Sequence, residues 1–237
     1  MTLFQPATFL HYLLSVDYLA AALNTLWISL AALTVGLMVG LVVAVSQEAR
    51  LAPIRAGAIF YLWLFRGTPA LVQIVFAFNV LPSFGIVLPG YACAVLALGL
   101  NEGAYMAEIM RAGIRAIAQG QREAGRSLGL DDRQIMRLII LPQAIRIIIP
   151  PIGNQFIGML KLSALVSVIG VHELLLTADQ AASSNFRYFE ALSAAGMYYL
   201  FLTTVFMLVQ GRIEWAVRSD KTGRPAPLLS RLAERPL

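Results

Sequence analysis

The sequence contains only one cysteine, Cys93, and few charged residues for a chain of 237 residues. A single thiol excludes a disulfide framework and a cysteine-rich metal cluster, so we expect no metal site. Charged residues make up 13% of the chain, which is about half the share found in soluble domains. This shortage of charge argues against an ordinary soluble fold.

Motifs of nucleotide hydrolysis and of intramembrane catalysis are also missing. The chain has no G-x-x-x-x-G-K-[ST] phosphate loop, no H-E-x-x-H and no G-x-S-x-G. We therefore identify no catalytic residue and expect the chain itself to be no hydrolase. The net charge of +5 does not by itself indicate nucleic acid, because basic residues in membrane proteins orient the chain.

Long apolar runs dominate what the sequence does contain. Hydrophobic residues make up 59% of it, and their runs are continuous rather than alternating, which favours spanning helices over a β-barrel. We predict an all-α membrane protein with about five transmembrane helices. The expected spans are residues 19–45, 69–81, 91–109, 138–169 and 189–209.

Proline and charge interrupt two of these runs. Arg66 to Pro69 should break the second run, which leaves residues 59–65 as a piece near the interface. Pro142, Pro150 and Pro151 are expected to break the fourth.

Basic residues predict the orientation. Most lysines and arginines fall after the first span, after the third span or in the C-terminal tail, which share one side if there are five spans. The positive-inside rule then places the N-terminus outside and the C-terminus in the cytoplasm.

A polar stretch between the third and fourth spans has the pattern of a helical hairpin. Residues 121–128 have helical character, and Gly129 stands where a left-handed cap would end that helix. Asp131 with Gln134 three residues later predicts a capping box that starts a second helix. A structured, charged hairpin indicates a docking surface.

The same stretch carries a family resemblance. Glu123-Ala124-Gly125, then Gly129, Ile139 and Leu141-Pro142 resemble the EAA motif of ABC importer permeases, with glycine in place of the second alanine. The segments LFRGTP, AYMAEIMRAGI and LKLSALVSVIGVHEL resemble the polar amino acid permeases, which import histidine, arginine, glutamine or glutamate.

The resemblance implies a type I ABC importer permease in the cytoplasmic (inner) membrane. Residues 1–217 would form the permease domain, with an ATPase-docking loop at about 111–142 and a basic cytoplasmic tail at 218–237. Alternating access would be driven by two separate ABC ATPase subunits that bind ATP and Mg. The other implied partners are a second permease subunit, identical or different, an extracytoplasmic solute-binding protein and a small polar amino acid. Contacts with the ATPase would come from Glu123, Ala124, Gly125, Gly129, Leu141 and Pro142.

Polar residues inside the predicted spans are candidates for the substrate pathway, because charges there are costly. The candidates are Asn101, Glu102, Tyr105, Asn154, Lys161 and Ser163. A zwitterionic amino acid would suit one acid, Glu102, and one base, Lys161. The alternative is that these two charges simply neutralise each other.

Two pairs of glycines, Gly36 with Gly40 and Gly99 with Gly103, have the small-x-x-x-small spacing that allows helices to approach closely. We expect them to pack helices within the subunit, although dimerisation is a second use of such pairs.

Other functions remain open at this stage. The substrate could be an opine or a sulfur amino acid. A secondary transporter driven by an ion gradient is less favoured, because it needs no ATPase-docking hairpin. A membrane scaffold would show no solute-dependent activity.

Overall fold

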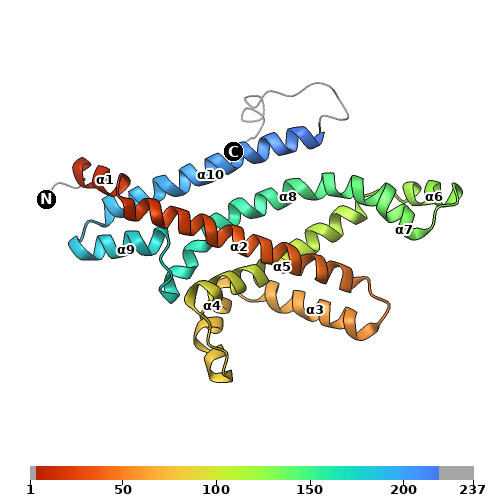
Figure 1. The fold of residues 1–237 in the computed structure, drawn as a ribbon, viewed down its shortest axis with the longest axis horizontal. Coiled ribbons are helices and arrows are strands. Elements are labelled where there is room, and N and C mark those ends of the chain that lie inside the picture. The colour runs from red at the N-terminus through yellow and green to blue at the C-terminus, as the bar shows by residue number, and fades with distance from the viewer. Residues whose placement is uncertain (1–3, 219–237) are drawn as a thin grey trace.

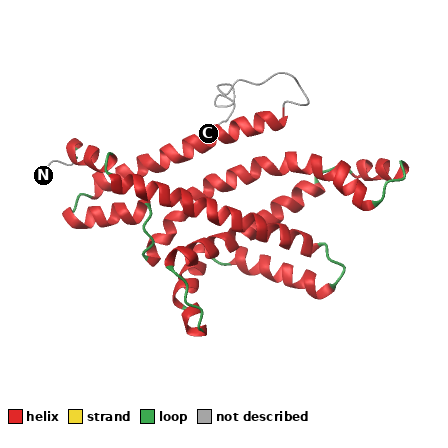
Figure 2. Ribbon diagram, viewed as in Figure 1, coloured by secondary structure: helices red, strands yellow, loops and turns green. Residues whose placement is uncertain are grey.

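The computed structural model describes residues 4–218 and contains only helices in that range (Figure 2). The prediction of an all-α chain is therefore confirmed for the described residues. From residue 219 on, the expected basic tail lies outside them. Three long helices run along the long axis of the molecule, and α5 crosses next to α2 (Figure 1). They are α2 (Val16–Gln47), α8 (Leu141–Leu162) and α10 (Tyr188–Arg218), with α5 spanning Gly90–Arg115.

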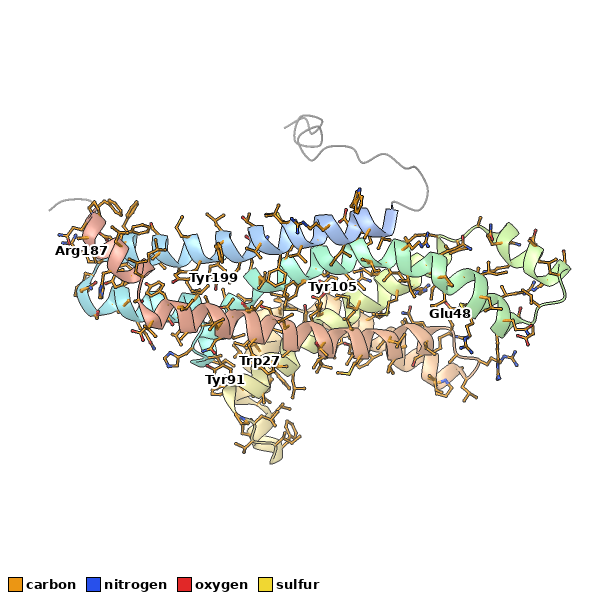
Figure 3. All side chains as sticks on the ribbon, turned by 45° about the horizontal axis from the view of Figure 1, so that its top comes forward. Trp27, Glu48, Tyr91, Tyr105, Arg187 and Tyr199 are labelled. Atoms are coloured by element: carbon orange, nitrogen blue, oxygen red, sulfur yellow. The ribbon has the colours of Figure 1, made fainter. Side chains whose placement is uncertain are left out.

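The two ends of the molecule are built differently. At one end α1 (Pro6–Leu13) and α9 (Leu174–Asn185) pack against α10. At the other end α6 (Gln119–Ser127), α7 (Asp132–Gln134) and a π-helical segment, η2 (Ile135–Ile140), project beyond the bundle (Figure 1). Figure 3 places Arg187 at the first end and Glu48 toward the second. The basic hairpin thus lies at the opposite end from Arg187, as the predicted orientation requires.

Within the described residues, three helical stretches are long and apolar enough to cross a membrane: Val16–Gln47, Asp132–Ile169 and Tyr188–Val217. The pair α3 (Ala52–Gly67) and α4 (Ala70–Asn79) would add a fourth span if both helices count as one. Helix α5 has 26 residues, or ~39 Å of length, and exceeds a ~30 Å bilayer core, but it carries several charges. The count of five spans stays a prediction.

The predicted break at Arg66 to Pro69 is confirmed. Helices α3 and α4 meet there at an angle of 103°. Residues 59–65 form the second half of the 16-residue helix α3, and their place near the membrane interface stays a prediction. A 3₁₀ turn, η1 (Leu81–Phe84), follows α4 and ends at Gly85, whose φ is +79°.

The prediction that prolines break the fourth run is wrong. Pro142 follows the π-helical segment η2 directly, as the second residue of α8, and Pro150 and Pro151 lie inside that helix. Proline keeps a helical φ, and side chains of neighbouring helices can bind the backbone near it. Gln210 of α10 does so by donating to the Pro150 carbonyl at 3.0 Å. Helix α8 then continues into a 3₁₀ segment, η3 (Ser163–Ile169).

Glycines bring α2 and α5 into close contact, as their spacing predicted. A Cβ atom at Gly40 would lie 2.5 Å from the Cβ of Met106, and one at Gly36 would lie 2.9 Å from the Cβ of Glu102. From the other side, a Cβ at Gly99 would lie 2.7 Å from the Cβ of Val35. The four glycines therefore pack two helices of the same subunit.

A buried carboxylate fixes the start of α9, in the loop between the candidate spans. Glu173 is fully buried, and it accepts hydrogen bonds from the N–H groups of Leu175 and Leu176 and from the Tyr199 hydroxyl. Burial raises the pKa of the Glu173 carboxyl, while these hydrogen bonds oppose the shift. The carboxylate acts as the N-cap of α9, so its role is structural.

Replacing Gly40 with alanine should destabilise the protein by ~1–3 kcal/mol, because the added methyl group meets Met106 and the backbone of Ala107. Thermal unfolding of the detergent-purified protein measures the effect. Gly57→Ala is the matched control, since a Cβ at Gly57 in α3 meets nothing within 4 Å. Equal melting temperatures for both variants and the wild type would contradict the close packing.

Candidate functional site: a cavity beside the broken helix pair

Polar side chains hold the break between α3 and α4 against α5. The Nδ2 of Asn101 donates to the Phe65 carbonyl at 3.1 Å and to the Oε1 of Gln73 at 3.2 Å. The Nε2 of Gln73 donates in turn to the carbonyls of Phe65 and Thr68, both at 3.1 Å. Carbonyls that lose their helical partners at the break are thereby satisfied, which is a requirement inside a membrane.

A cavity of about 600 Å³ opens beside this break. Its volume is within the range of small-molecule sites. Helix α5 contributes three of the predicted pathway residues: Asn101, Glu102 and Tyr105. The break contributes residues 66–70, and α8 contributes Gln155, Gly158, Met159 and Leu162.

Glu102 is the buried charge of the cavity, with 4% of its surface exposed. Its Cβ and Cγ atoms lie against α2 at Gly36, and its carboxylate has a hydrogen-bond partner in Gln155. Among the described residues, however, its Oε1 atom has no hydrogen-bond partner. An unpartnered buried carboxylate oxygen is costly, so its presence points to a ligand or to another use.

The structure does not bring the other three predicted pathway residues to this cavity. Asn154 turns toward α10, where its Oδ1 accepts from Gln210 at 3.1 Å. Ser163 is fully buried and donates to the Leu160 carbonyl at 2.9 Å. Lys161 is exposed on α8, and no ion pair joins it to Glu102 within residues 4–218. The base expected opposite Glu102 is therefore not Lys161.

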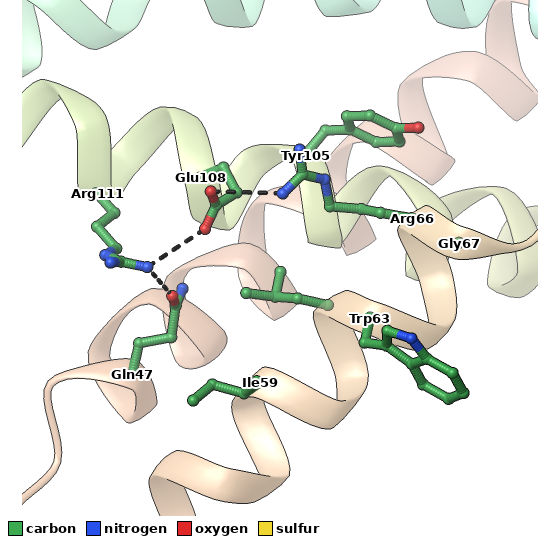
Figure 4. Close-up of a pocket in the computed structure, with 9 residues that line it drawn as sticks. Gln47, Ile59, Trp63, Arg66, Gly67, Tyr105, Glu108 and Arg111 are labelled. Atoms are coloured by element: carbon green, nitrogen blue, oxygen red, sulfur yellow. Dashed lines mark hydrogen bonds and ion pairs between the residues drawn. The ribbon is translucent and has the colours of Figure 1, made fainter.

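Arg66 is the base that the sequence reading missed, and it lines both the first cavity and a second one of about 550 Å³. Figure 4 shows the second cavity with Arg66 beside Tyr105 and Glu108. The Arg66 guanidinium lies 3.4 Å from the carboxylate of Glu108 and 5.9 Å from the centre of the Tyr105 ring. Glu108 also pairs with Arg111 at 3.6 Å, and Arg111 contacts Gln47 of α2. The network joins α2, α3 and α5.

The hairpin at the far end has the predicted geometry. Helix α6 ends before Gly129, whose φ of +78° is the left-handed conformation expected there. Asp131 and Gln134 form the predicted capping box, with reciprocal hydrogen bonds of 2.8 and 2.9 Å. The two helices pack closely at Gly125, where a Cβ would lie 2.8 Å from the Cγ1 of Ile135.

The residues of the predicted ATPase contact lie on both arms of this hairpin. Glu123 and Ala124 lie on α6, and the Glu123 carboxylate accepts from Gln119 at 2.9 Å. Leu141 and Pro142 begin α8 just beyond η2. Leu128, at the tip, has 79% of its surface exposed.

Comparison with known proteins decides the family. Residues 32–219 match the family described as the binding-protein-dependent transport system inner membrane component. The chain belongs to this family. It is an inner-membrane permease subunit of an ABC transport system, and such subunits are not hydrolases.

Two relatives show how far the permease likeness extends. The arginine transport system permease protein ArgU of Corynebacterium glutamicum is 38% identical over 221 residues, which cover 87% of this chain and 70% of that protein. The glutamine transport system permease protein GlnP of Escherichia coli (strain K12) is 38% identical over 192 residues, or 80% of this chain and 88% of GlnP.

Solved structures support the same architecture. A crystal structure of an amino acid ABC transporter with histidines matches the permease with a TM-score of 0.80 and 41% identity, covering 84% of this chain and 92% of that one. The MetNI methionine ABC transporter, in an inward-facing conformation, matches with a TM-score of 0.72 at 19% identity and shows the fold alone.

Removing the capping box should loosen the second arm of the hairpin. We expect Asp131→Ala to destabilise the α7 start by ~1 kcal/mol and to lower the hydrogen-exchange protection of residues 132–140 roughly fivefold. Exchange mass spectrometry of the purified permease measures this. Arg133→Ala, a substitution of an exposed side chain two residues away, should leave protection unchanged. Equal protection in Asp131→Ala and wild type would contradict the capping role.

Proposed function

We propose that this permease is the membrane-spanning subunit of an ATP-driven importer of a polar amino acid. The observation that carries the proposal is the match over most of the chain to permeases named for arginine and glutamine transport and to an amino acid ABC transporter. The complex would contain a second permease subunit, two cytoplasmic ATPases that bind ATP and Mg, and an extracytoplasmic solute-binding protein.

The hairpin formed by α6, Gly129 and α7 is the proposed docking site of the ATPase. It projects beyond the other helices at one end of the molecule (Figure 1). Its second arm continues through η2 into α8, which lines the cavity at Gln155 and Gly158. A rotation of the hairpin by a closing ATPase would therefore be passed along one helical rod to the cavity. Glu123, Ala124, Gly125, Gly129, Leu141 and Pro142 are the proposed contacts or pivots.

The cavity beside the broken helix pair is the proposed point on the substrate path. Asn101, Glu102 and Tyr105 line it together with Arg66 and Gln155. It combines the unpartnered Oε1 of Glu102 with the guanidinium of Arg66, which also pairs with Glu108, and such a lining suits a small solute that carries both charges. Asn154, Lys161 and Ser163 are not lining residues of this cavity.

Glu123→Lys and Gly129→Asp should abolish, or reduce by ~10-fold or more, the amount of ATPase that co-purifies with the permease, because one reverses a docking charge and the other strains a left-handed turn. Affinity purification of the co-expressed complex measures this. Gly85→Asp is the matched control, since Gly85 has a φ of +79° and lies in the turn after η1. Normal ATPase capture by both hairpin variants would refute the docking proposal.

A further inference from the structure

The break between α3 and α4 does more than interrupt a helix, because it turns the N-terminus of α4 toward the Glu102 cavity. Residues 67–70, which form the break and the first residue of α4, line that cavity. Among residues 4–218, no side chain caps α4, whose N-cap is Pro69. The Thr68 hydroxyl, which stands close enough in sequence to cap it, donates instead to the Leu64 carbonyl.

An uncapped helix N-terminus attracts anions. Its first N–H groups have no helical acceptor, and the helix dipole places a partial positive charge there. Helix α4 has ten residues, and its first helical hydrogen bond runs from Gln73 N–H to the Pro69 carbonyl. Arg66 lines the same cavity, and its guanidinium, which also pairs with Glu108 at 3.4 Å, adds positive charge on this side. A carboxylate that enters the cavity could accept hydrogen bonds from the first N–H groups of α4 and from the guanidinium of Arg66.

A second, independent feature of the cavity favours a positively charged group on the ligand. The Oε1 atom of Glu102 is buried in the wall of the same cavity with no partner among the described residues, and Lys161 does not neutralise it. An ammonium group of a ligand would supply the missing donor. The cavity thus has an acceptor on the α5 side and a set of donors at the break.

We propose that the cavity holds a free amino acid by its main-chain groups, with the α-ammonium on Glu102 and the α-carboxylate between Arg66 and the N-terminus of α4. This inference rests on the proposed function and deepens it. It assigns Arg66 and the first turn of α4 as the anion-binding part of the site. Gln155, Tyr105 and Gly158 then face the ligand's side chain.

Blocking either charge of the ligand tests the arrangement. The complex of permease and ATPase, reconstituted in lipid nanodiscs without its binding protein, is titrated with the standard L-amino acids. The strongest ligand is then compared with its α-amide and its Nα-acetyl derivative. The Nα-acetyl derivative should bind roughly tenfold or more weakly, because it leaves the buried Glu102 oxygen without a donor. The α-amide should also bind more weakly, because it removes the negative charge that Arg66 and the N-terminus of α4 attract.

Variants assign each charge to a residue. Glu102→Gln should weaken binding of the free amino acid roughly tenfold and should reduce the loss of affinity caused by Nα-acetylation. Glu102→Asp should recover part of the affinity for the free amino acid. Arg66→Met should instead reduce the loss of affinity caused by converting the α-carboxylate to the α-amide. Co-purification of the ATPase with each variant shows that the complex is folded.

The outcomes separate this inference from the proposed function. Full affinity for both blocked derivatives, or full affinity in Glu102→Gln, would overturn the main-chain arrangement while import of an amino acid still stands. If no standard amino acid binds the complex or is imported by it with its binding protein, the proposed function fails and the inference fails with it.

Discussion

The close approach of α2 and α5 is the constraint on which the site depends. Gly36 and Gly40 leave room for the backbone and the Cβ atoms of α5, so that Glu102 lies directly against α2. The same contact holds Asn101 where it can bind the Phe65 carbonyl and Gln73 of the broken pair. A Cβ at Gly36 would meet Glu102 itself, at 2.9 Å from both its Cβ and Cγ. The contact at Gly36 therefore determines both how α2 packs on α5 and where the buried carboxylate of Glu102 lies.

From this contact the rest of the molecule extends in two directions. Toward the hairpin, Glu108 and Arg111 of α5 join the end of α3 and the end of α2 through Arg66 and Gln47 (Figure 4). Toward the opposite end, α9 and α10 pack on α1 and α2 around a cluster of alanines and tyrosines. Tyr105 lies midway between these ends (Figure 3).

Much of this could be predicted because local signals set it. Pro69 after Arg66 fixed the break, Gly129 fixed the bend of the hairpin, and Asp131 with Gln134 fixed the next helix start. It was harder to predict from the sequence which polar side chains of a helix face the cavity. Asn154 and Gln155 are adjacent, and ~100° of rotation per residue decides which of them meets the cavity and which meets Gln210. The role of Arg66 depends on Glu108 and Tyr105, about 40 residues away, which no local pattern contains.

The central claim is that an amino acid occupies the cavity beside Glu102. Its most direct test is the rate at which a thiol reagent modifies Tyr105→Cys in the reconstituted complex, since Cys93 is buried and adds little background. Ser184→Cys, on exposed α9, serves as the reference. We predict that the imported amino acid slows modification at position 105 and leaves position 184 unchanged. Equal rates at position 105 with and without that amino acid would contradict the account.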